Sequence, residues 1–155
     1  MDEAVIIQRL VMHEGVRLMP YRCTRGKLTI GIGRCIDTHP FTADELKVVG
    51  DWKHGITKNA AFYLLRNDIK RTVEQVREAI SFYDRLDEER QYALIDMGFQ
   101  LGVLGLKRFK KMLEQMGVGN YKNAAKECLN SEYAKQVPVR AGRIAKLIET
   151  GKFEV

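Results

Sequence analysis

The sequence predicts a mainly helical α+β fold, with a small N-terminal antiparallel sheet, a long connecting helix and a helical C-terminal lobe. Three observations support this prediction. Residues 16–36 are β-prone and punctuated by glycines and one proline. Residues 58–80 carry apolar side chains at steps of three and four, as one face of a helix does. Beyond residue 80 the chain shows only helix and turn signals.

Composition places the chain among ordinary globular proteins. Its 155 residues fit one domain, and they are 45% apolar and 30% charged. The net charge of +6 favours anionic partners, including bacterial wall polymers. The basic residues are interleaved with acids and form no nucleic-acid-binding motif, so we expect no nucleic-acid partner.

The N-terminus lacks the features of a signal peptide. Acidic residues occupy positions 2 and 3, no basic region precedes the apolar run, and Arg9 interrupts that run. No stretch approaches the roughly 20 apolar residues that span a bilayer. We therefore expect neither a signal peptide nor a transmembrane segment, and no stable membrane insertion.

Three cysteines are an odd number, and their spacing is not that of a metal site: Cys23, Cys35 and Cys128. The sparse count predicts free thiols in a reducing compartment. Cys35 and Cys128 are typical of small buried apolar residues. No metal and no cofactor are expected.

The first helix is expected to end at Gly15, which places Glu14 at its C-terminus. The negative end of the helix dipole disfavours an ionised carboxylate there, which suits a proton donor. The following stretch alternates at Thr29-Ile30-Gly31-Ile32, as a strand does. Its glycines permit a close approach of the backbone to a ligand.

Capping signals define the next two helices. Thr42 and Glu45 form a predicted capping box for a helix over 43–50, and residues 51–55 are expected to form a loop. Thr57 is expected to cap the long helix, about 58–80. Its apolar stripe consists of Phe62, Leu65, Ile69, Val73, Val76 and Ile80.

The C-terminal region is predicted to be helical throughout. Asp87 caps a buried helix near 88–101 that Gly102 ends, and a second helix covers about 106–116. Asn120 caps a third over 121–129, and the last runs over about 138–149, with Pro138 first and Gly151 after its end. We expect a single domain, 1–155, with an N-terminal lobe at about 13–57, the connecting helix at 58–80, and a C-terminal lobe at 81–155 packed with helix 1–13.

The spacing of Glu14, Cys23 and Thr29 favours cleavage of an acetal bond. Glycoside hydrolysis needs a proton donor for the leaving oxygen and a group that supplies or steadies a nucleophile on the other face of the sugar. Glu14 can donate the proton, and Thr29 can hold a water by a hydrogen bond. The usual second group is a carboxylate, whereas this chain offers the Cys23 thiol. A surface carboxylate with two packing residues would give the same spacing.

The chain resembles the phage-type lysozymes, or endolysins, over about residues 5–150. The matching residues are Glu14-Gly15, Tyr21 to Thr24, Gly26 and Thr29 to Gly33, followed by Phe99-Gln100, Gly102 and the Gln136-x-Pro138-x-Arg140-Ala141-x-Arg143 segment. The family triad is Glu, eight residues, Asp or Cys, five residues, Thr, and this chain has the Cys form. The resemblance implies a lysozyme-like two-lobe fold and a muramidase.

The resemblance also implies a role for each matching residue. Glu14 is the catalytic acid, Cys23 takes the second catalytic position and Thr29 positions water. Arg140 matches an arginine that pairs with the catalytic Glu. Cys35, Phe99 and Gln100 fall in the substrate cleft, although simple core packing explains these three equally well.

A further implied contact is an ion pair between Arg34 and Asp68 across the lobes, because T-even members have a His at the first position that pairs with an acid on the connecting helix at the second. The chain departs from those members at three polar or aromatic positions, where it carries Met112, Glu127 and Tyr133. Its substrate subsites are therefore expected to differ.

The expected activity is hydrolysis of the β-1,4 bond between N-acetylmuramic acid and N-acetylglucosamine in bacterial peptidoglycan, for host-cell lysis. A lytic transglycosylase and a catalytically silent binding domain are the alternatives. We expect a monomer that stays in the host cytoplasm until it is released to the periplasm or cell wall. A secreted effector or a recruited bacterial muramidase would have the same sequence features.

Overall fold

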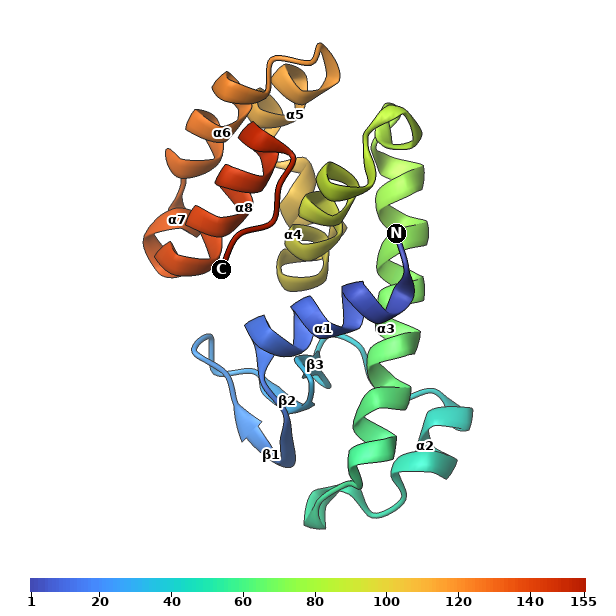
Figure 1. Ribbon diagram of the computed structural model, residues 1–155. Helices are drawn as coiled ribbons and strands as arrows, with labels where there is room; N and C mark the ends of the chain where they lie inside the picture. Colours follow the sequence, from blue (N-terminus) through green and yellow to red (C-terminus); the bar gives the residue numbers. More distant parts are fainter. The chain divides into compact units, whose positions relative to one another are not determined.

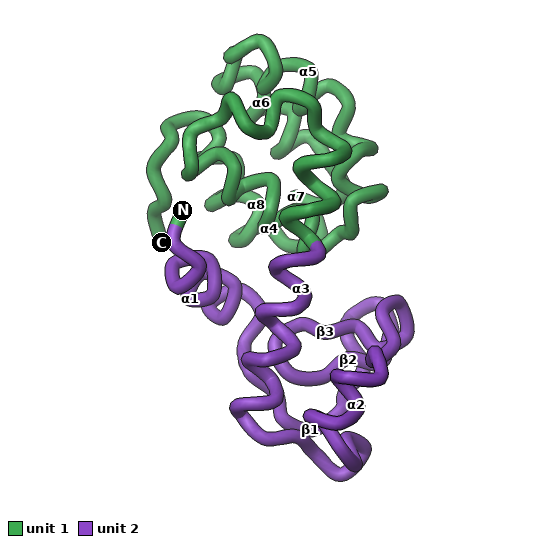
Figure 2. Tube along the Cα trace, turned by 90° about the vertical axis from the view of Figure 1, so that its right-hand side faces the viewer, with its two compact units in different colours: residues 1, 72–155 green, residues 2–71 purple.

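The structure is a computed structural model that describes all 155 residues, and its secondary structure confirms the predicted fold class (Figure 1). Its contacts divide the chain into two compact units (Figure 2). We call residues 2–71 the N-terminal unit, and residue 1 with residues 72–155 the C-terminal unit. The boundary falls inside the long helix α3, Lys58–Ala79, so this helix contributes to both units.

The N-terminal unit combines helices with the only sheet. After α1, Glu3–Glu14, come strands β1, Arg17–Arg22, β2, Leu28–Gly31, and β3, Arg34–Cys35. Helix α2, Ala43–Val49, the short 3-10 helix η1, Trp52–His54, and the first half of α3 complete the unit. The predicted loop at 51–55 thus contains one 3-10 turn.

Helix α1 begins and ends as its capping residues dictate. The Asp2 carboxylate accepts a hydrogen bond from the backbone N–H of Ala4, and the Gly15 N–H donates to the carbonyl of Val11. Gly15 has a φ of 71°, which a residue with a Cβ rarely adopts. The predicted end of the helix at Gly15 is confirmed, and Glu14 is the last helical residue.

The sheet is antiparallel, as predicted, and its strand order is β1-β2-β3. Tyr21 lies opposite Thr29, and Thr29 lies opposite Cys35 on the other side. These three residues therefore form one row across the sheet. The register shifts between Arg17 and Tyr21, so β1 contains an irregularity.

Two predicted caps are confirmed in the N-terminal unit. Thr42 and Glu45 make both hydrogen bonds of the capping box at the start of α2. The Thr57 hydroxyl accepts a hydrogen bond from the Ala60 N–H at the start of α3. The unit's core packs around fully buried side chains of α1, β2 and α3, including Leu10, Ile30, Ala61, Leu64 and Leu65.

The C-terminal unit holds the remaining helices. They are η2, Tyr83–Arg85, α4, Glu88–Lys107, α5, Lys110–Gly117, α6, Tyr121–Leu129, α7, Glu132–Gln136, and α8, Pro138–Thr150. Helix α8 packs against α4, α6 and α7, and α5 packs against α6. The core includes Leu94, Met97, Leu106, Cys128, Ile144 and Leu147.

One prediction for these helices is confirmed, and two need correction. Gly102 ends the regular geometry of the buried helix, with φ 75° and ψ 161°, and a short second helical segment of α4 follows directly as far as Lys107. Asn120 precedes α6 without making a side-chain cap. The short helix α7 was not predicted, although Ser131 caps it through the N–H of Ala134.

The remaining fold predictions have mixed outcomes. Pro138 opens α8 and Gly151 ends it in the left-handed conformation, as expected. The packing of helix 1–13 with the C-terminal lobe stays a prediction, and α1 belongs to the N-terminal unit by its contacts. None of the helices has the length and apolar character required to span a bilayer.

Candidate functional site

The Glu14 carboxylate lies against the backbone of Gly33. A Cβ atom built on Gly33 would be 2.7 Å from the Glu14 Oε1 atom and 2.9 Å from its Cδ atom. No real side chain tolerates such distances, so a residue other than glycine would have to displace the carboxylate. Gly33 also has a φ of 73°. The end of α1 thus brings a half-buried carboxylate against the turn after β2.

Cys23 occupies the turn between β1 and β2. Its backbone N–H donates to the carbonyl of Lys27, and its carbonyl accepts from Gly26 N–H. Burial disfavours the ionised thiol, whereas the nearby backbone N–H groups of Arg25 and Lys27, the Thr29 hydroxyl and the positive charge of Arg25 favour it. Their combined effect lowers the pKa of Cys23 below 9.0. The turn therefore provides the surroundings of an anion at this position.

Thr29 links this turn to the sheet. Its hydroxyl donates to the carbonyl of Lys27 at 3.0 Å, and the same hydroxyl is within hydrogen-bonding reach of the Cys23 sulfur. A hydroxyl has one hydrogen, so it can donate to only one of these partners at a time. Ionisation of Cys23 would draw that hydrogen toward the thiolate. The buried Thr29 oxygen keeps lone pairs with which to accept a hydrogen bond from water.

Tyr21 adds a group that the sequence did not single out. Burial raises its pKa above 10.0, and the negative charges of Glu14 and Cys23 raise it further, while Arg17 opposes them. The guanidinium of Arg17 lies 3.9 Å from the centre of the Tyr21 ring. Glu14 and Cys23 are therefore both close enough to Tyr21 to act on its ionisation.

Cys35 lies next to Thr29 in the row across the sheet. Its sulfur is 3.0 Å from the Thr38 hydroxyl, and the residue is half-buried. The prediction that Cys35 is a small buried apolar residue is therefore wrong, because strand β3 is short and its end is open to a polar partner. Cys128 is fully buried, as predicted, and all three cysteines are free thiols.

The other predicted site residues belong to the C-terminal unit. Phe99 and Gln100 are half-buried near the kink of α4. The Nε of Arg140 donates to Asp96 at 2.8 Å, and the Tyr92 hydroxyl donates to the other carboxylate oxygen at 2.7 Å. Asp96 is completely buried, so this ion pair belongs to the core of the unit. Pairing of Arg140 with Glu14 stays a prediction.

The predicted Arg34–Asp68 ion pair is present, with 3.3 Å between Nη1 and Oδ1. It lies within the N-terminal unit, and its main partner was not predicted. Glu45 accepts hydrogen bonds from both terminal nitrogens of Arg34, and Asn67 and Arg71 complete the buried network around the two carboxylates. Burial raises the pKa of Asp68, against the effect of the two arginines.

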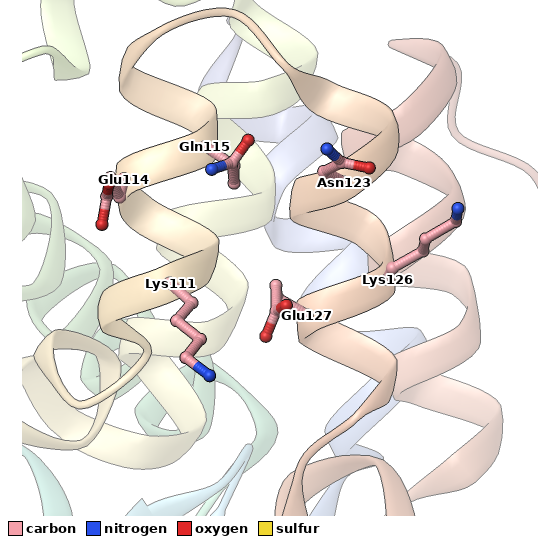
Figure 3. Close-up of a pocket in the computed structure, with 6 residues that line it drawn as sticks. All are labelled: Lys111, Glu114, Gln115, Asn123, Lys126 and Glu127. Atoms are coloured by element: carbon pink, nitrogen blue, oxygen red, sulfur yellow. The ribbon is translucent and has the colours of Figure 1, made fainter.

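A polar pocket of about 330 Å³ lies between α5 and α6, wholly inside the C-terminal unit (Figure 3). Its lining residues are Lys111, Glu114, Gln115, Asn123, Lys126 and Glu127. Glu127 is one of the positions at which the chain departs from T-even lysozymes. The second, Met112, is buried in the core, and the third, Tyr133, is buried with its ring edge-on to Phe109.

No three His, Cys, Asp or Glu side chains gather in a way that could hold a metal ion. Two participants in the site were missed by sequence reasoning. Tyr21 and Gly33 are part of the motif shared with phage-type lysozymes, but the sequence assigned Tyr21 no role and gave Gly33 only that of a permissive backbone position. The left-handed turn at Gly33 and the pairing of Tyr21 with Thr29 are properties of the folded hairpin, and a single sequence signals them only through the glycine-rich TIGIG stretch.

Comparison with known proteins identifies the class. The chain belongs to the Phage lysozyme family, which it matches over residues 11–146. It is 29% identical over 155 residues to probable T4-type lysozyme 2 of Dictyostelium discoideum, with 91% of each chain covered. It is 33% identical over 152 residues to probable T4-type lysozyme 1 of the same organism, with 89% of each covered.

Two phage proteins are also similar. Over 154 residues the chain is 34% identical to the pre-baseplate central spike protein Gp5 of Enterobacteria phage T4, covering 91% of this chain and 27% of that protein. An endolysin of Acyrthosiphon pisum secondary endosymbiont phage 1 is 28% identical over 131 residues, covering 84% of this chain and 77% of that endolysin. Membership of the family supports a muramidase-like function of lysing peptidoglycan.

Proposed function

We propose that the protein is an endolysin that hydrolyses the β-1,4 bond between N-acetylmuramic acid and N-acetylglucosamine. The observation that supports the proposal most directly is that the Glu14 carboxylate lies against Gly33, while the negative charges of Glu14 and Cys23 both act on Tyr21. Glycoside hydrolysis requires a proton donor and a second group that supplies or activates a nucleophile, and we assign these roles to Glu14 and Cys23.

In this mechanism the Glu14 carboxyl protonates the glycosidic oxygen as its bond to the muramic acid C1 carbon breaks. A water that hydrogen-bonds to Thr29 attacks C1 from the other face and forms the new C–O bond. Its proton passes to the Cys23 thiolate, whose negative charge also stabilises the developing positive charge on the sugar. Solvent then returns a proton to Glu14 and removes one from Cys23.

The Cys23 sulfur can alternatively act as a covalent nucleophile. Two substitutions separate these roles. Cys23→Asp keeps a negative charge without a thiol, so retained lysis supports water activation. Cys23→Ser keeps a small polar group that stays neutral, so we expect it to lose most of the activity. Loss of activity in Cys23→Asp with retention in Cys23→Ser would overturn the proposed role.

The products test the reaction itself. Mass spectrometry of muropeptides released by the wild-type protein should show hydrolysed ends, and Glu14→Gln should release none. A product one water lighter would identify a lytic transglycosylase, which closes a 1,6-anhydro ring. Glycan binding without any product from the wild type would identify a silent binding domain.

The proposal also includes the stage of host-cell lysis at which the protein acts. An endolysin would act as a monomer, collect in the host cytoplasm and reach the wall once a separate membrane protein opens the way. Expression of the protein alone should leave host cells intact, and expression with a membrane-permeabilising protein should lyse them. Lysis by the protein alone would contradict the proposed route.

A further inference from the structure

The strongest unassigned feature is a run of four basic side chains where α4 gives way to α5. We call Lys107, Arg108, Lys110 and Lys111 the basic cluster. All four are exposed, and none makes a side-chain hydrogen bond or an ion pair in the structure. Because five consecutive residues span at most about 15 Å, their fields overlap at physiological salt, where the Debye length is about 8 Å.

The charge of the C-terminal unit is divided along the chain. Residues 72–106 carry three basic and seven acidic side chains, a net −4, whereas residues 107–155 carry eleven basic and five acidic ones, a net +6. The basic cluster begins at this change of sign. The N-terminus of α5 adds to it, because Phe109 offers no side-chain cap and the first turn holds no acid.

We propose that the basic cluster binds a phosphodiester polymer of the bacterial wall, such as a teichoic acid, through residues other than the glycan-cleaving ones. The inference rests on the proposed function insofar as a muramidase meets such polymers on its substrate. Lysine and arginine side chains without intramolecular partners are the groups that phosphates bind in proteins. Binding would hold the enzyme on the wall between cleavage events.

The surroundings of the basic cluster favour a narrow, flexible chain. Glu114 and Glu127 line the pocket next to Lys111 (Figure 3), so a broad anionic surface would meet acids as well as bases. The Phe109 ring packs edge-on against the Tyr133 ring, with 5.8 Å between the ring centroids. Phe109 is therefore already engaged within the protein and is not available to stack on a nucleobase. Leu104 is the exposed large apolar side chain closest in sequence to the basic cluster. A single such side chain offers too little apolar area for binding to a membrane surface.

The test measures binding of soluble poly(glycerol phosphate) to the wild-type protein as a function of salt. Four phosphate contacts should give a slope of log affinity on log salt of about −3, from roughly 0.7 counterions released per phosphate on a single chain. Replacing all four residues of the basic cluster by Gln should weaken binding at least tenfold and flatten that slope. Hydrolysis of wall glycan stripped of the polymer should remain at the wild-type rate.

The matched control removes the same charge elsewhere. Gln at Lys58, Lys70, Arg85 and Lys152, which are exposed and form no ion pair, also lowers the net charge from +6 to +2. We expect less than a threefold change in affinity for this variant. Equal losses in the two variants would show that only net charge matters and would overturn the proposal, as would unchanged binding in the variant of the basic cluster.

Two further probes distinguish other partners. Duplex DNA and vesicles of anionic phospholipid should each bind more weakly than poly(glycerol phosphate) at equal phosphate concentration. Tighter binding to either would overturn the assignment to a wall polymer. The binding measurement does not depend on cleavage. If the protein binds the polymer but releases no muropeptide, the proposed enzymatic activity is refuted and the proposed binding site is not.

Discussion

Gly33 determines where the Glu14 carboxylate can lie, and one substitution tests this. Gly33→Ala would place a methyl group within 3 Å of that carboxylate, so the acid must move. A displacement of about 1 Å of a catalytic group can cost roughly 100-fold in rate. We therefore expect wall lysis by Gly33→Ala to fall about 100-fold, measured as the initial loss of turbidity.

Gly31→Ala is the matched control for that substitution. Gly31 has nearly the same backbone strain, with φ 71° against 73°, but its added methyl group would meet only ordinary contacts at 3.5 Å or more. Both variants should lose about 1–2 kcal/mol of stability from the left-handed conformation. Equal activity of the two variants would show that the strain of the turn, and not the position of Glu14, limits lysis.

The Cys23 turn predicts an acidic thiol. Because its pKa is lowered from 9.0, the half-maximal rate of alkylation by iodoacetamide should occur below pH 9. Thr29→Val removes a hydrogen bond to the thiolate and should move that midpoint upward. Cys128 provides the internal reference, since it is fully buried and its pKa is raised to about 12, so it should stay unlabelled in the folded protein. A Cys23 midpoint at or above pH 9 would contradict the assigned hydrogen bonds.

The sequence predicted the location and burial of some single residues better than those of others. Glu14, Cys23 and Thr29 all belong to the N-terminal unit, because a helix end, short strands and a tight turn separate them by few residues. The burial of Cys35 was mispredicted, since the end of a two-residue strand is open to solvent and to Thr38. Residue type alone does not report where a strand stops.

At the scale of elements, the buried Arg34 network connects β3, α2 and α3. Burial favours the neutral form of Glu45, but hydrogen bonds from Arg34 and Asn67, with the N–H of Thr42, lower its pKa from 4.5 to about 2. A lowered pKa stabilises the fold above the unfolded value of 4.5, and this stability is lost as the pH falls from 4.5 toward 2. The shift corresponds to about 3 kcal/mol.

Glu45→Gln should therefore destabilise the protein by about 3 kcal/mol at pH 7, and its difference from wild type should shrink between pH 4.5 and 2. Urea unfolding at a series of pH values measures both quantities. Asp44→Asn on the same helix is the control, because Asp44 is exposed and its nearest cation, Lys47, is 4.0 Å away. If the difference in unfolding free energy between Glu45→Gln and wild type does not change with pH, the substitution acts through packing and not through the charge of Glu45.

The capping residues made the boundaries of α1, α2, α3 and α8 predictable, because each cap is a local hydrogen bond or a local turn. The end of the buried helix at Gly102 was predictable for the same reason, because a glycine with positive φ commonly ends a helix. The helical segment that follows directly, as far as Lys107, was not predicted, and its Leu106 is fully buried. Its burial depends on packing against residues distant in sequence, which local signals do not report.

For the whole molecule, hydrophobic periodicity and β-prone composition were sufficient for the fold class. The network of Arg34 with Glu45 and Asp68 was only partly predicted, since its members are 11 and 34 residues apart along the chain. Resemblance suggested one of the two pairs, and the other depends on how α2 packs beside β3. Contacts distant in sequence are set by packing, which periodicity does not specify.

The net charge of +6 gives the last prediction, because it concerns the approach of the whole protein to an anionic wall. The Debye length falls from about 30 Å at 10 mM salt to about 8 Å at 150 mM, so attraction at a distance is lost over this range. Lysis of intact walls should slow several-fold between these concentrations. Walls stripped of phosphodiester polymer and amidated at their carboxyl groups should be lysed at a rate that salt hardly changes. An equal slowing on both substrates would place the effect of salt on the enzyme itself and would exclude electrostatic steering as its cause.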